Sequence, residues 1–196
     1  MNPIPKGYYS LFEVDEKTGQ VRTIFKDRKN SIMYDWGRIA CQCLALGKRE
    51  YRINGIYLEY QNTSPPGSIP SFNLDAGVEY YQGLSGNRDY LRLPLSSTPL
   101  LKVETGWEDY FSGEDDDFNA ATFFAQTAGT VGVNGLPFSA ASNSLAIGMA
   151  LVACPVWEDK TRDIVFARTY YSVSEQTPKQ NNHQLSISWT LPFVLS

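Results

Sequence analysis

The stretch Leu185–Leu195 reads LSISWTLPFVL, and large apolar residues occupy every second position of it. Successive side chains of a β-strand point to opposite faces, so this stretch predicts a strand with one apolar and one polar face. A slip of one residue would expose every large side chain, so the alternation also fixes the pairing register. Pro192 cannot donate a ladder hydrogen bond, which places it at a strand end or at an edge.

Many other short apolar runs precede this strand, and Gly, Pro and Asn residues separate them. Strands are expected over residues 8–14, 21–25, 51–60, 78–84, 90–95, 100–105, 107–111, 120–125, 145–153 and 164–173. Gly19 lies in the turn between the first two runs and predicts a hairpin, because glycine readily adopts a positive φ. Short strands at such intervals predict a mostly β protein, an antiparallel sandwich or a jelly-roll-like domain.

One run is apolar at nearly every position. Residues 145–153 have no polar face, which fits either a strand buried on both sides or a short buried helix. The length of the run favours the strand.

One α-helix is expected over residues 30–47, because apolar residues recur there at helical spacing. The expected buried face consists of Ile32, Trp36, Ile39, Cys43 and Leu46. Asn30 or Ser31 would cap the first turn, and Gly47 would take a left-handed conformation after the last turn. Gly37 lies inside this helix and would permit a strand to cross it closely.

Length and composition predict a single domain over residues 1–196, with long loops at about 61–77 and 127–143. The basic residues are scattered and the net charge is −4, which argues against nucleic acid as a partner. The sequence has no long apolar run and no signal peptide, so neither a membrane span nor classical secretion is expected. Three cysteines, Cys41, Cys43 and Cys154, are expected to be reduced.

An acidic run supplies the only metal candidate. Asp115, Asp117 and Asn119 match the start of an EF-hand calcium loop. Ala120 then stands where that loop needs Gly, and Gln126 stands where it needs Glu. The alternatives are an irregular calcium site and a solvated acidic turn.

The sequence contains no catalytic motif that would suggest an enzyme. Its single histidine, His183, is flanked by Asn and Gln residues in a polar segment. No G-x-S-x-G elbow, P-loop, dinucleotide fingerprint or zinc spacing is present. We therefore expect neither catalytic residues nor a cofactor.

Aromatic residues supply the candidate binding positions. Trp107 and Trp157 lie beside acidic residues and could stack on sugars, although tryptophans at strand ends often belong to the core. The acidic neighbours are Glu104, Glu108, Asp109, Glu158 and Asp159. Each Tyr-Tyr pair would place one ring in the core and one ring outside, and Tyr81 and Tyr171 are the candidate interface rings.

Two blocks of the sequence resemble known proteins. The first block is the run from Lys29 to Ile32 that opens the expected helix, followed by INGIYL at 53–58 and a Pro-rich break. The second runs from IVFAR at 164–168 through EQTPK at 175–179 to the alternating strand. Together they resemble β-rich structural virion proteins of tailed bacteriophages, of the tail, collar or fibre-attachment type.

The resemblance implies a role in assembly, without a cofactor or catalytic residues. The expected partners are other copies of the chain and other virion proteins, after synthesis in the host cytoplasm. Two alternatives stay open. One is a capsid decoration protein, because a small jelly-roll-like domain suits trimeric cementing, and the other is a carbohydrate-binding module.

Overall fold

The computed structural model describes residues 6–32, 50–61, 79–82, 88–102, 120–126, 145–176 and 183–192, together with residues 37, 39, 41 and 45–47. The described residues form a mostly β, sandwich-like structure. Its strands are β1 (Lys6–Asp15), β2 (Val21–Ile32), β3 (Arg52–Gln61), β4 (Glu79–Gln82), β5 (Arg88–Pro94), β6 (Leu100–Lys102), β7 (Ala120–Gln126), β8 (Leu145–Cys154), β9 (Ile164–Tyr170) and β10 (His183–Pro192). Two short 3-10 helices follow β8 and β9, namely η3 (Lys160–Arg162) and η4 (Val173–Glu175).

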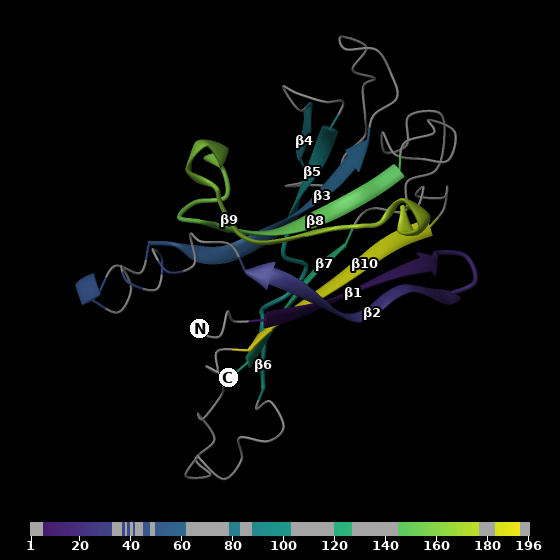
Figure 1. Ribbon diagram of the computed structural model, residues 1–196, viewed down its shortest axis with the longest axis horizontal. Coiled ribbons are helices and arrows are strands. Elements are labelled where there is room, and N and C mark those ends of the chain that lie inside the picture. The colour runs from purple at the N-terminus through teal and green to yellow at the C-terminus, as the bar shows by residue number, and fades with distance from the viewer. Residues whose placement is uncertain are drawn as a thin grey trace.

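The strands pair in the order β4-β5-β3-β8-β9-β2-β1-β10-β7-β6, and every pair is antiparallel. This run folds into two layers, and β9 and β2 join them through only two residue pairs. The first layer contains β4, β5, β3, β8 and β9, and the second contains β2, β1, β10, β7 and β6 (Figure 1). The layers also meet beyond β5, where the Ser96 N–H donates to the Phe124 carbonyl at 2.8 Å.

The core lies between the layers and contains side chains from both of them. At its centre the Trp189 and Tyr9 rings lie 5.6 Å apart between centroids, and Tyr9 also contacts Phe25 and Tyr171. Large aromatic side chains bury the most apolar area per residue, so this cluster contributes much of the hydrophobic stabilisation.

The alternation expected for the last strand is confirmed. In β10 the odd positions from Leu185 to Leu191 are buried, and the even positions from Ser186 to Thr190 are partly exposed. The strand lies between β1 and β7, so the apolar face covers the middle of the core rather than its margin.

Two further expectations about strands are confirmed. β1 and β2 form the expected hairpin, in which Gly19 has a φ of 69°. β8 is buried at nearly every position, as a strand covered on both faces must be. The expected strand over 107–111 and almost all of both expected long loops lie outside the described residues.

The helix expected over residues 30–47 is not seen, and its expected start is wrong. β2 continues to Ile32 and pairs with both β1 and β9, so Asn30 and Ser31 belong to a strand and cap no helix. Pairing with two neighbouring strands overrode the local helical spacing. The backbone is helical at residues 37, 39, 41, 45 and 46, but the described part of the segment contains no continuous helix.

Details of that segment also differ from expectation. An added Cβ at Gly37 would meet no atom of the described residues within 4 Å, so none of the described strands crosses there. Leu46 is 65% exposed rather than buried, whereas Ile39 is buried and Gly47 has the expected positive φ, 62°. Cys43, expected to pack in the core, lies outside the described residues.

The position of β10 in the core gives a testable prediction. Replacing Trp189, which is 0% exposed, with Ala should lower the free energy of unfolding by about 3–5 kcal/mol, through lost burial and a residual cavity. Ser188→Ala, on the opposite face of the same strand, should change it by less than about 1 kcal/mol. Urea denaturation measures both, and equal midpoints for the two variants would contradict the assignment of faces.

Candidate functional site

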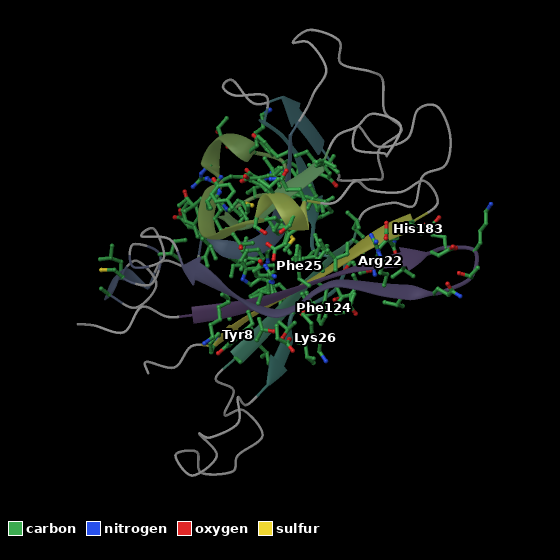
Figure 2. The ribbon with its side chains drawn as sticks, turned by 45° about the vertical axis from the view of Figure 1, so that its right-hand side comes forward. Tyr8, Arg22, Phe25, Lys26, Phe124 and His183 are labelled. Atoms are coloured by element: carbon green, nitrogen blue, oxygen red, sulfur yellow. The ribbon has the colours of Figure 1, made fainter. Side chains whose placement is uncertain are left out.

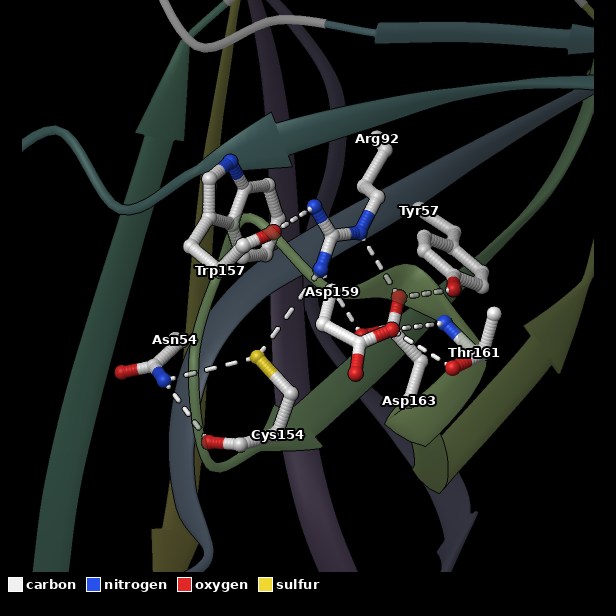
Figure 3. Close-up of polar contacts among 8 residues, drawn as sticks. All are labelled: Asn54, Tyr57, Arg92, Cys154, Trp157, Asp159, Thr161 and Asp163. Carbon is white, nitrogen blue, oxygen red and sulfur yellow. Dashed lines mark hydrogen bonds and ion pairs between the residues drawn. The ribbon is translucent and has the colours of Figure 1, made fainter.

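Among the described residues, the densest group of polar contacts lies on the outer face of the first layer, where the segment between β8 and β9 folds back over β5, β3 and β8 (Figure 3). It consists of Asn54, Tyr57, Arg92, Cys154, Trp157 and Asp163, and we call it the Arg92 cluster. The cross-strand pair Tyr57–Arg92 comes from the register of β3 and β5. Asp163 follows η3, immediately before β9.

Arg92 and Asp163 form a buried ion pair with two parallel hydrogen bonds. Arg92 Nε donates to Asp163 Oδ2 at 2.7 Å, and Arg92 Nη2 donates to Oδ1 at 2.8 Å. The two side chains are 0% and 5% exposed, so the pair is shielded from water. Tyr57 donates a further hydrogen bond to Asp163 Oδ2, which leaves this carboxylate with contacts on both oxygens.

Trp157 covers the guanidinium. The Arg92 Cζ atom lies 3.6 Å from the centroid of the indole, and Arg92 Nη1 donates to the Trp157 carbonyl. The ring lies directly over Gly55, where an added Cβ would fall 2.2 Å from Trp157 Cη2 and 2.4 Å from the Leu93 carbonyl oxygen. Only a glycine at position 55 permits this approach of ring and strand.

Cys154 completes the cluster at the end of β8. The Asn54 side-chain amide donates to the Cys154 carbonyl at 2.8 Å and lies 3.4 Å from Sγ. Burial raises the pKa of the Cys154 thiol, and the hydrogen bond from Asn54 opposes this effect only in part. A thiol that stays protonated is a poor nucleophile, so Cys154 acts here as a packed side chain.

Burial also raises the pKa of the Tyr57 phenol, and its hydrogen bond to Asp163 adds to the increase. Tyr57 therefore stays neutral and donates its proton to the carboxylate at all ordinary pH values. The groups of the Arg92 cluster satisfy one another's charges and hydrogen bonds. Such an arrangement attaches the β8–β9 segment to the sheet and leaves no activated acid, base or nucleophile.

A second charged group lies near the turn of the β1–β2 hairpin (Figure 2). Glu13 is buried and pairs with Arg22 at 2.7 Å. The His183 ring lies between two carboxylates, with Nδ1 3.3 Å from Glu13 and Nε2 3.5 Å from Asp15. Hydrogen bonds from the backbone of Thr18 and Lys17 lower the pKa of Asp15. These contacts join the first residue of β10 to the last residues of β1.

A third ion pair joins β2 to η4. Arg28 contacts Glu175, whose carboxylate also accepts a hydrogen bond from the Ser172 backbone N–H at 2.9 Å. The hydrogen bond from Arg28, followed by those from Ser172, lowers the pKa of Glu175 from 4.5 to about 2. The pair holds the turn after β9 against the second layer.

The structure places only some of the sequence-based candidates. Trp157 is only partly exposed, and one face of its ring lies on Arg92 rather than being open to a sugar. Tyr171 is 6% exposed and packs in the core, so its assignment as an interface ring is wrong. The exposed member of that pair is Tyr170, because the chain leaves β9 between the two residues.

The remaining candidates cannot be placed. Trp107, Asp115, Asp117 and Asn119 lie outside the described residues, and so does the side chain of Tyr81 in β4. Within the described ranges, no group of three or more His, Cys, Asp or Glu side chains is arranged to hold a metal ion. The described part of the chain also contains no helix that is long and apolar enough to span a membrane.

The Arg92 cluster was not predicted from the sequence. Arg92 and Asp163 are 71 positions apart, and neither belongs to a recognisable motif. The one available signal was a lone Arg within the apolar run at residues 90–95, because an unpaired charge is rarely buried.

Comparison with known proteins gives no identification. No protein family model, no curated protein and no solved structure matches this chain.

The buried pair predicts a large effect when one partner is neutralised. Asp163→Asn should lower the free energy of unfolding by about 3–5 kcal/mol, because Arg92 would stay buried without its counter-charge. Glu158→Gln, an exposed neutralisation in the same segment, should change it by less than about 0.5 kcal/mol. Adding Arg92→Met to Asp163→Asn should recover part of the loss, and chemical denaturation of the four proteins measures these differences. Equal stability of Asp163→Asn and the unmodified chain would contradict the assignment.

The Arg28–Glu175 pair predicts a pH dependence. Because folding lowers the pKa of Glu175, the pair contributes stability above pH 4.5, and this contribution disappears as the pH falls towards 2. In Arg28→Gln the pKa of Glu175 should return towards 4.5. Carboxyl carbon NMR during an acid titration measures both values, and a normal Glu175 pKa in the unmodified chain would refute the contact.

Proposed function

We propose that this chain is a structural component of a tailed-bacteriophage virion, which assembles as an oligomeric tail, collar or fibre-attachment module. The observation that supports this most is the sheet edge at β6. This strand is last in the strand order, and no described strand pairs with its other side. Leu100 and Leu101 are 57% and 51% exposed there, on opposite faces of the strand.

The described edge is short, because β6 has only three residues, Leu100, Leu101 and Lys102. Exposed edge strands offer unpaired N–H and C=O groups to other chains, and natural proteins usually protect them with charges, bulges or covering segments. The two exposed leucines leave apolar area at this edge, which supports a contact in which another subunit adds a strand or packs on it.

The use of charge in the described residues also favours a structural role. Arg92–Asp163, Glu59–Arg168 at 2.9 Å and Glu13–Arg22 each join different strands or segments. Each pair contains at least one buried member. These ionisable groups therefore stabilise the two layers, which suits a protein that acts through its shape and surface.

A capsid decoration protein is the alternative, because a jelly-roll-like domain with an apolar edge could equally seal contacts between capsid subunits. Both functions place the chain in a particle. Labelling the chain and imaging particles by electron microscopy separates them, since decoration predicts label over the head and the leading proposal predicts label on the tail or collar.

The proposal predicts that the chain is present in phage particles purified from the cells that make it, at a copy number set by the symmetry of the assembly. Quantitative mass spectrometry of gradient-purified particles measures this. Replacing both Leu100 and Leu101 with Lys should reduce incorporation about tenfold or more, equivalent to ~1.4 kcal/mol of contact energy. Val173→Lys, at an 85% exposed position elsewhere, is the control and should incorporate normally. Absence of the unmodified chain from particles would refute the proposal.

A further inference from the structure

The strand order has an open edge at each of its ends. β4 comes first and β6 comes last, so each of them pairs with a described strand on one side only. β4 pairs with β5 in the first layer, and β6 pairs with β7 in the second layer. Figure 1 shows the two strands far apart, with β4 near the top of the view and β6 near the bottom. The two edges therefore cannot pair within one copy, but they can pair between two copies.

The residues of β6 alternate between the two faces of their layer. Leu101 pairs with Ala121, a residue of the core, so Leu101 lies on the inner face. Opposite residues of an antiparallel pair share a face, and neighbours along a strand point to opposite faces. Leu100 and Lys102 therefore lie at outward positions. Leu100 and Leu101 are 57% and 51% exposed, so apolar area is available on both faces of this edge.

The residues of β4 can be placed on faces in the same way. Tyr80 pairs with Leu91, which is buried in the core, so position 80 belongs to the inner face of the first layer. Glu79 and Tyr81 precede and follow it along the strand, so both belong to the outward face. β4 thus has an aromatic residue at a position on each face and its acidic residue at an outward position.

The two edges match in one antiparallel register. Placing Leu101 opposite Tyr80 sets inner positions opposite inner positions and outward positions opposite outward positions. The pairs of this register are Leu100–Tyr81, Leu101–Tyr80 and Lys102–Glu79. The first two pairs combine apolar side chains, whose burial is favourable. The third pair combines opposite charges, which stabilises a sheet when the residues lie directly opposite each other.

Other pairings of these edges lack the charge match. A shift of two residues in either direction keeps the faces matched but separates Lys102 from Glu79. Pairing β6 with β6 of another copy opposes Lys102 at best to Leu100, and pairing β4 with β4 opposes Glu79 at best to Tyr81. Opposite charges meet only when β6 of one copy pairs with β4 of another copy.

We propose that β6 of one copy adds to the edge of β4 in the next copy as an antiparallel strand, in the register that opposes Lys102 to Glu79. The inference rests on the oligomeric function proposed above and names the segments in contact. In this arrangement the sheet continues from copy to copy, as in other cases of β-strand addition. Because the two edges differ, each added copy offers a free edge to another copy, which produces a ring if the rotation closes and a filament if it does not.

The short length of the two strands limits the strength of this contact. Three residues at about 3.4 Å each form roughly 10 Å of paired strand. Such a contact buries much less than the ~800 Å² that each partner of a standard interface buries. We therefore expect weak, reversible association of the isolated chain. Closing a ring makes one of the contacts intramolecular, which strengthens the assembly without any new surface.

Sedimentation velocity over about 10 µM to 1 mM tests the proposal, because this range covers weak association. The unmodified chain should associate reversibly. Lys102→Glu should weaken association about tenfold, because like charges then stand opposite each other at every contact. Lys17→Glu is the matched control, since it makes the same change of charge at an exposed position in the β1–β2 turn and should leave association unchanged.

A mixing experiment identifies the two edges. Glu79→Lys alone should also associate weakly, and Glu16→Lys is its matched control in the same exposed turn. An equimolar mixture of Lys102→Glu and Glu79→Lys should associate like the unmodified chain, because each contact between unlike copies again opposes a positive to a negative residue. Far-UV circular dichroism establishes that all the variants are folded.

Three results would overturn the inference. They are a monomeric unmodified chain at about 1 mM, an association that Lys102→Glu weakens no more than Lys17→Glu does, and a mixture of the two variants that fails to associate. None of these results decides whether the chain is present in purified particles. Failure of this contact can therefore be distinguished from failure of the proposed function.

Discussion

The structure depends on the two-residue alternation of β10. Its apolar positions supply Leu185, Ile187, Trp189 and Leu191 to the core, and its polar positions, Ser186, Ser188 and Thr190, lie on the opposite side of the layer. Because the strand lies between β1 and β7, its register positions both neighbours. The side chains that pack against the first layer are thus arranged by one strand, and a slip of one residue would exchange the core with the surface.

The outward sides of the two layers differ in what covers them. The first layer is covered by its own β8–β9 segment, and this requires the buried Arg92–Asp163 pair together with the close approach of Trp157 to Gly55. A buried pair contributes little net stability but is costly to break, so it specifies where the segment lies more than it strengthens the fold. The second layer has no comparable cover in the described residues, and its outward side combines hydroxyl and aromatic side chains with charged residues of β2, such as Lys29, which pairs with Tyr8.

Local patterns predicted the parts of the fold that local physics determines. The alternation in β10, the hairpin at Gly19 and the doubly buried strand β8 follow from side-chain period and turn chemistry. The prediction of a helix start at residues 30–32 was wrong, because residues 31–32 pair with β9, more than 130 positions away, and this pairing determines their conformation. The Arg92 cluster could not be predicted for the same reason. Its members are brought together by the register of β3 with β5 and by the path of the β8–β9 segment, which are both non-local. The Tyr170–Tyr171 pair was correctly expected to divide between core and surface, but the wrong ring was assigned to the surface because the strand end could not be located.

Amide hydrogen exchange of the unmodified chain tests the dependence on β10 most directly, because exchange reports the free energy of local opening. Amides of residues 185–191 should exchange only through global unfolding and be among the slowest in the protein, together with their partners in β1. Exchange in β10 as fast as in the turn at residues 16–19 would contradict the account, since a strand that opens locally cannot organise the core.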